Sequence, residues 1–232
     1  MADILAMAIT AAVIVVLWKG LGKAETHITT NIEIEAALKP SKPGVIITFD
    51  REHGSNGKQI GRLVADRLGV PFYYKEMIAL AAKESGLATE FIDRINVDEP
   101  CAMHSLYLST EPVQQAIIAQ EQIIRKIADN GSCVIVGRAA GYVLREHKNT
   151  VSIFIHAPED YRVAQVMKNY GDTREQADKS IARSDTARSS YFAKISGLKW
   201  GDTKQYDLCL DSSIGMEQTA NVILTYVASV IA

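Results

Sequence analysis

A glycine-containing loop between an apolar run and a helical pattern has the residue types that hold phosphate. Residues 45–49 read VIITF and lead directly into residues 50–61, which read DREHGSNGKQIG. Glycines let the backbone come close to an anion, and N–H groups at the start of the following helix point at it. A lysine after the second glycine adds a mobile positive charge for the outer phosphates. The loop therefore predicts a nucleotide-phosphate site made of Gly54, Ser55, Asn56, Gly57, Lys58 and Gln59.

This loop departs from the common pattern G-x-x-x-x-G-K-[ST] at two positions. Glu52 stands where the first glycine belongs, and Gln59 replaces the hydroxyl residue that would bind Mg²⁺. From the residues alone, two interpretations stay open. The loop is either a phosphate cradle or an ordinary strand-to-helix turn whose glycines only cap and pack.

The elements that must position this loop follow from the apolar pattern. Strands are expected at residues 45–49, 70–73, 133–136, 152–155 and 206–210. Helices are expected at residues 57–68, 75–84, 90–96, 112–129, 159–169, 174–193 and 216–231. Alternating strands and helices of this kind pair in parallel and carry helices on both faces. The pattern predicts an α/β fold of the P-loop, three-layer type, with a parallel sheet of about five strands.

An uncharged apolar segment precedes this domain. Residues 4–18 read ILAMAITAAVIVVLW, and Lys19 and Lys23 follow. As a helix, the segment spans about 22 Å, against about 30 Å for the hydrocarbon core of a bilayer. Three interpretations stay open: a membrane anchor, a helix docked on its own domain or a partner, and a processed leader. Lysines behind an anchor favour the cytoplasm for the rest of the chain.

Domain boundaries are expected near residues 22 and 43. Residues 1–22 form the apolar helix, residues 23–43 form a linker that ends in a Lys-Pro-Ser-Lys-Pro run, and residues 44–232 form the main domain. Two prolines in five residues resist helix and mark the boundary.

Composition excludes several classes of protein. The 25 basic and 27 acidic residues among 232 give no basic field for nucleic acid. The three cysteines, Cys101, Cys133 and Cys209, form no CxxC motif, so neither a zinc site nor a disulfide framework is indicated. This favours a reducing, cytoplasmic compartment. The sequence does not fix an oligomeric state.

Four ordered motifs resemble the cytidylate-kinase-like family of P-loop proteins. They are REHGSNGKQIG, CVIVGRAAGYVLR, IARSDTARSSYF and GLKWGDTKQYDLCLDSS, and the resemblance spans residues 44–232. Asp50, His53 and Asn56 stand where that family commonly has serine, an aromatic residue and glycine. Gln59 is no departure there, because those loops often lack the hydroxyl. The resemblance implies a nucleoside-monophosphate-kinase fold with a mobile lid, ATP and Mg²⁺ as cofactors, and small nucleotides as partners.

The same resemblance implies roles for individual residues. Catalytic contacts to the transferred phosphate are expected from Lys58, Arg183 and Arg188. Contacts to the acceptor are expected from Arg51, Arg138, Arg162 and Asp185. Asp50, at the tip of the first strand, is expected to hold Mg²⁺ through water. The alternative for the charged residues is a solvated helix surface with local ion pairs.

Three functions stay open on this basis. The first is ATP-dependent phosphoryl transfer to a small acceptor, CMP or dCMP first. The second is a catalytically weak nucleotide-binding module at the membrane, favoured because Val136 and Gly137, at the end of the third strand, stand where a metal-binding acid is expected. The third is a structural role in which the loop binds nothing.

Overall fold

Five parallel strands form one sheet in a computed structural model that describes residues 44–86 and 110–231. The strands are β1 (Ile46–Arg51), β2 (Phe72–Tyr73), β3 (Cys133–Val136), β4 (Thr150–His156) and β5 (Leu208–Asp211). Their order across the sheet is β2-β3-β1-β4-β5. The predicted parallel α/β sheet of five strands is confirmed.

The helices connect these strands and agree closely with the sequence pattern. They are α3 (Gly57–Leu68), α4 (Glu76–Ser85), α7 (Glu111–Asp129), α8 (Ala140–Val143), α9 (Glu159–Tyr170), α10 (Arg174–Ser196) and α11 (Met216–Ile231), with short 3-10 turns η1 (Thr203–Gln205) and η2 (Ser212–Ile214). The sequence did not predict α8, since a single turn is too short to show a periodic pattern. The helices expected at residues 4–18 and 90–96 lie outside the described residues. Within 44–86 and 110–231, no helix combines the length and apolarity needed to cross a membrane.

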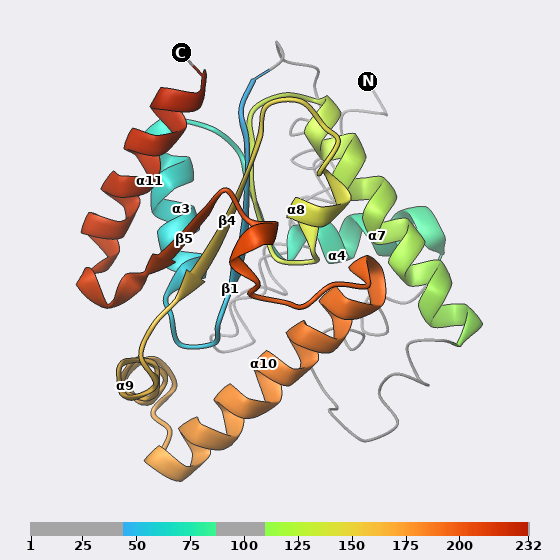
Figure 1. The fold of residues 1–232 in the computed structure, drawn as a ribbon. Coiled ribbons are helices and arrows are strands. Elements are labelled where there is room, and N and C mark those ends of the chain that lie inside the picture. Colours follow the sequence, from blue (N-terminus) through green and yellow to red (C-terminus); the bar gives the residue numbers. More distant parts are fainter. Residues whose placement is uncertain (1–43, 87–109, 232) are drawn as a thin grey trace, which may run out of the picture. The chain divides into compact units, whose positions relative to one another are not determined.

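Helices cover both faces of the sheet. In Figure 1, α3 and α11 lie on one side of the strands, and α7 and α8 lie on the other. The helices α9 and α10 lie beyond the strand ends at which the arrowheads of β1 and β4 point. This is the carboxyl edge of the sheet, where open α/β sheets bind ligands.

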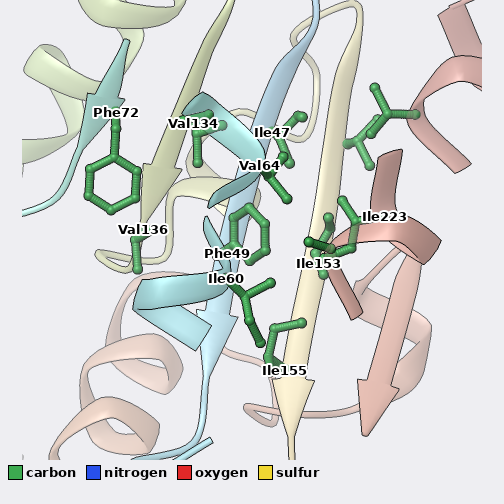
Figure 2. Close-up of a cluster of buried hydrophobic side chains, with 14 of the residues drawn as sticks. Ile47, Phe49, Ile60, Val64, Phe72, Val134, Val136, Ile153, Ile155 and Ile223 are labelled. Carbon is green, nitrogen blue, oxygen red and sulfur yellow. The ribbon is translucent and has the colours of Figure 1, made fainter. Parts of the chain in front are cut away.

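β1 is buried because strands pair with both of its edges and helices α3 and α8 pack on its two faces. Ile47 pairs with Val134 of β3 and Val151 of β4, and Phe49 pairs with Val136 and Ile153. Figure 2 shows Ile47 and Phe49 packed with Ile60 and Val64 of α3.

Ile47, Ile60 and Val64 are completely buried. Burial of each such side chain stabilises the fold by about 1.5–3 kcal/mol. The apolar core thus fixes β1 and α3, the two elements that flank the predicted phosphate loop.

The edge strand β5 differs from its prediction. It begins at Leu208 rather than at residue 206, and Tyr206 instead directs its hydroxyl to Asp50, 3.1 Å away. Cys133 on the inner strand β3 is buried, whereas Cys209 on β5 is only partly buried. An edge strand has a neighbour on one side only, so it is less covered.

Candidate phosphate-binding pocket

A pocket of about 230 Å³ opens at the carboxyl ends of β1, β2 and β3. Its walls come from these strand ends, from α9 and α10, and from the segment after α10. They are lined by Asp50, Arg51, His53, Tyr74, Lys75, Val136, Gly137, Arg138, Ala139, Tyr170, Ser184, Arg188, Tyr191, Phe192 and Trp200. The structure therefore brings together four of the residues predicted to bind ligand, namely Asp50, Arg51, Arg138 and Arg188.

Positive charge dominates this pocket. Arg51, Lys75, Arg138 and Arg188 contribute cations from four different segments. Burial lowers the pKa of His53 to about 4, and Arg188 and Arg51 act in the same direction. Burial also lowers the pKa of Arg188 to about 10, with Arg51 adding to the shift and Asp185 opposing it. A bound anion would offset the repulsion by which Arg51 helps to lower the pKa of Arg188.

Tyr74 joins the pocket to the phosphate loop. Its ring lies 5.5 Å from the Arg51 guanidinium carbon and 5.0 Å from the Lys58 ammonium nitrogen. Burial alone would raise the pKa of the Tyr74 hydroxyl, but Arg51, Arg188, Lys58 and Lys75 together lower it. Tyr74 and Lys75 were not among the residues predicted from the sequence. Their position directly after β2 could have identified them, because the carboxyl ends of parallel strands lie at one edge of the sheet, where ligands bind.

The predicted phosphate loop has the backbone shape that its glycines allow. Gly54 has φ of 82° and Asn56, the residue before α3, has φ of 56°. A Cβ atom on Gly54 would lie 2.6 Å from the carbonyl oxygen of Arg162, so only glycine fits there. The hydroxyl of Ser212, in η2, donates to the Ser55 carbonyl at 2.7 Å and so ties the loop to η2.

Helix α3 begins directly after this loop, at Gly57. The first N–H groups of an α-helix have no acceptor within the helix, and they carry its positive partial charge. Lys58 and Gln59 are exposed beside them. The loop thus has the backbone and charge to receive an anion, although phosphate binding by Gly54 to Gln59 stays a prediction.

Asp50 is a buried carboxylate in an otherwise cationic pocket. It is 7% exposed and accepts a hydrogen bond from Tyr206 at 3.1 Å. Burial raises its pKa, while Arg51, Tyr206 and Arg188 oppose that shift. The Tyr206 contact joins the segment before β5 to the end of β1.

The described residues offer few ligands for Mg²⁺. Between residues 44–86 and 110–231, no group of three or more His, Cys, Asp or Glu side chains could hold a metal ion. Asp50 is the one carboxylate among the described pocket-lining residues. Mg²⁺ in kinases is usually held by one or two carboxylates together with substrate phosphates and water. One carboxylate does not build such a site alone, so Asp50 as a metal ligand stays a prediction.

Arg138 sits in a strained turn after β3. Its φ is 62°, between Gly137 at 86° and Ala139 at 51°. The side-chain oxygen of Gln120, on α7, accepts from the Tyr191 hydroxyl at 2.8 Å and from Arg138 at 3.5 Å. Because guanidinium can only donate, the Gln120 oxygen and not its nitrogen must face Arg138.

Gln120 was also not among the residues predicted from the sequence. It is 1% exposed, and it occupies a position of α7 that continues the buried stripe of Ile117, Ile124 and Ile127. Gln120 could have been identified in the sequence as a polar residue on an otherwise apolar helix face.

Three further predicted residues do not line the pocket. Arg162 and Asp185 form an ion pair at 2.5 Å and contact the loop backbone instead. Arg183 is exposed on α10, and its charge contributes to the lowered pKa of His53. Their predicted contacts with acceptor or transferred phosphate stay untested by this geometry.

Aromatic side chains form one wall of the pocket. The rings of Trp200 and Phe154 meet edge to face at 5.3 Å, and Tyr206 contacts Phe154 at 5.0 Å. Trp200 and Phe192 also line the pocket. Trp200 therefore packs in the aromatic cluster and presents a surface to a ligand at the same time.

Comparison with known proteins identifies the family of this chain. A cytidylate kinase from Methanopyrus kandleri is 25% identical over 189 residues, which cover 78% of this chain and 91% of that protein. The crystal structure of an uncharacterized protein from Eubacterium ventriosum ATCC 27560 has a TM-score of 0.62 and 28% identity, covering 80% of this chain and 98% of that one. Residues 46–214 match the Cytidylate kinase-like family. This match covers most of the chain and includes both the loop and the pocket, so the chain belongs to the cytidylate kinase-like family.

Proposed function

We propose that this protein transfers a phosphoryl group from ATP to a nucleoside monophosphate, with CMP or dCMP as the first acceptors to test. The family is one of kinase-like phosphotransferases, which implies ATP and usually Mg²⁺. One observation carries the proposal: a pocket with four cations and an aromatic wall lies directly beside a glycine-containing loop at the carboxyl edge of the sheet. Such a pocket suits an acceptor that has both a phosphate and a ring.

Phosphoryl transfer asks mainly for positioning and charge neutralisation from the protein. The N–H groups at the start of α3 and the Lys58 ammonium would hold the donor phosphates. Arg51, Arg138 and Arg188 would hold the acceptor phosphate and balance negative charge that develops between the two nucleotides. The Tyr74 ring lies near both Lys58 and Arg51, so it would lie close to both phosphate groups. A Mg²⁺ ion bound with ATP would add further positive charge there.

A coupled assay of ADP release tests the proposal. The full chain is supplied with ATP, Mg²⁺ and, one at a time, CMP, dCMP, UMP, AMP and GMP. We expect turnover with at least one pyrimidine monophosphate, within the usual range of about 1–100 per second for kinases. Shikimate and gluconate serve as acceptors without a phosphate group. Folded protein that turns over none of the monophosphates would contradict the proposal.

A second candidate is a nucleotide-binding module with weak or no catalysis. Gln59 stands in place of a metal-binding hydroxyl, and Asp50 alone supplies a carboxylate among the described pocket-lining residues. Calorimetry with ATP and CMP that finds binding of both, in protein without turnover, would favour this module. A membrane tether through residues 4–18 would belong to it, and removal of residues 1–40 followed by membrane fractionation tests that part.

A further inference from the structure

A network of charged groups ties the first half of the phosphate loop to α9 and α10. Nη1 of Arg162, on α9, donates to Asp185 of α10 at 2.5 Å and to the His53 carbonyl at 3.3 Å. The other Asp185 oxygen accepts from the His53 N–H at 2.7 Å. His53 is thus held through both its backbone groups by one ion pair.

The residues on either side of His53 are held by the same network. The Glu52 carboxylate lies 3.4 Å from Nε of Arg162 and accepts from the Ala157 N–H at 3.1 Å. The pocket residue Arg188 donates to the Arg51 carbonyl at 3.1 Å, and it lies 3.5 Å from Asp185. Gly54 packs against the Arg162 backbone. Four consecutive loop residues, 51 to 54, therefore depend on two helices distant in sequence.

The side chains at the centre of this network are poorly placed to meet a ligand. The side chains of Arg162 and Asp185 are 13% and 19% exposed, and neither lines the pocket. Both Asp185 oxygens already accept hydrogen bonds from the protein. An acceptor could reach them only by breaking charge-assisted bonds, which are the stronger kind.

We propose that Arg162 and Asp185 are positioning residues that set the shape of the phosphate loop and the place of Arg188, rather than contacts to the acceptor. The inference rests on the proposed function, because it concerns the same phosphate sites. It follows that donor binding and acceptor binding are coupled through α10. A shift of α10 changes both the backbone of His53 and the guanidinium of Arg188, which faces the pocket.

ATP binding in the absence of any acceptor separates the two roles. If Arg162 and Asp185 only contact the acceptor, Asp185→Asn and Arg162→Gln leave the Kd of ATP unchanged. If they position the loop, each variant weakens ATP binding by about tenfold, the usual effect of losing one charge-assisted bond. The double variant should be no weaker than the worse single variant, because both changes remove one shared pair. Isothermal titration calorimetry with MgATP measures all four proteins.

Matched controls keep the result interpretable. Asp178→Asn removes an exposed carboxylate from the same helix and should leave the Kd of ATP unchanged. Asp185→Glu keeps the charge and should recover most of the affinity. Arg162→Lys keeps a cation but loses the planar guanidinium that contacts Asp185 and Glu52 together, so it should weaken ATP binding a few-fold. This milder variant remains a test if the other variants do not fold. Melting curves confirm that each variant is folded.

The outcomes distinguish this inference from the function on which it rests. Parent protein that binds no ATP would overturn both. Parent protein that binds ATP, with unchanged ATP affinity in folded Asp185→Asn, Arg162→Gln and Arg162→Lys, would overturn the positioning role alone. In that case, a raised KM for the acceptor would assign the pair to direct contact.

Discussion

Two strand-to-helix turns at the carboxyl edge of the sheet reach the left-handed backbone region by different means. The turn from β1 to α3 has positive φ at Gly54 and Asn56. The turn from β3 to α8 has three consecutive positive values, at Gly137, Arg138 and Ala139. The first turn uses residue types that tolerate this region, whereas the second places arginine and alanine in it.

The two turns therefore offer different groups to an anion. In the first turn, the backbone N–H groups at the start of α3 would be the binding groups of the proposed donor site. In the second turn, the strained residue Arg138 carries a charge, so its side chain would be the binding group of the proposed acceptor site. Left-handed backbone costs a residue with Cβ about 1–2 kcal/mol. A cost of that size at a pocket is typical of residues kept for function.

Removal of the Lys58 charge tests whether the first turn holds the donor. Lys58→Ala should reduce turnover by about 10²–10³-fold, since removal of a single group that stabilises transition-state charge has this effect. The stability of the fold should hardly change, because the Lys58 side chain is exposed. Steady-state kinetics and melting temperature measure the two quantities. ATP binding as tight as in the parent protein would show that the loop is an ordinary turn.

A second change tests the backbone of the same turn. Gly54→Ala meets the Arg162 carbonyl oxygen and requires a positive φ, so it should destabilise the fold by about 3 kcal/mol. Gly69→Ala is the matched control, because φ there is also positive, at 65°, yet no atom lies within 4 Å of the added Cβ. It should cost only about 1 kcal/mol. Urea unfolding measures the free energy of unfolding of both variants. Equal losses of stability would mean that the contact with Arg162 is unimportant.

The third change tests the strain of the second turn. Arg138→Gly and Arg138→Ala both remove the guanidinium, so both should raise the KM of the acceptor alike. Only glycine relieves the positive φ, so the glycine variant should be about 1–2 kcal/mol more stable than the alanine variant. Chemical denaturation compares the two proteins. A more stable alanine variant would contradict strain at this position.

The smallest effect concerns the pH dependence of stability. The pKa of His53 is about 4 in the folded protein, below its ordinary value of 6.5, so the unfolded chain binds more protons between these values. The stability that His53 contributes is therefore present above pH 6.5 and is lost as the pH falls towards 4.

His53→Phe removes this titration and keeps a ring to stack on Tyr170, whose centroid lies 5.9 Å from that of His53. Between pH 6.5 and 5, the variant should lose less stability than the parent, by less than about 1 kcal/mol because His53 is partly exposed. Unfolding curves at both pH values measure this. Equal losses in the two proteins would show that His53 does not resist protonation.

The phosphate loop could be read from the sequence because its chemistry is local. The strand before it, the glycines within it and the helix after it are contiguous, and α3 has the predicted bounds of Gly57 to Leu68. Arg138 was named through the family resemblance, and it follows β3, which was predicted at its observed bounds. Tyr74 and Gln120 were not found, because their importance comes from neighbours distant in sequence.

Charged residues on α9 and α10 show the limit of reading sequence alone. An acceptor site needs arginine and carboxylate side chains, and Arg162, Asp185 and Arg188 are of these types. In the structure, Arg188 lines the pocket, whereas Arg162 and Asp185 pair with each other outside it. Helical periodicity gives the face of a helix but not the partner that the face meets.

The five strands, the longer helices among the described residues and the glycines of the loop could be predicted from the sequence, because backbone preferences and apolar periodicity act over a few residues. The set of cations that share one pocket follows from the tertiary structure. Arg51, Lys75, Arg138 and Arg188 come from four segments that parallel strand pairing and the packing of α10 bring to one edge. Electrostatic interactions depend on distance in space, and the distances between these groups do not exist until the sheet has formed.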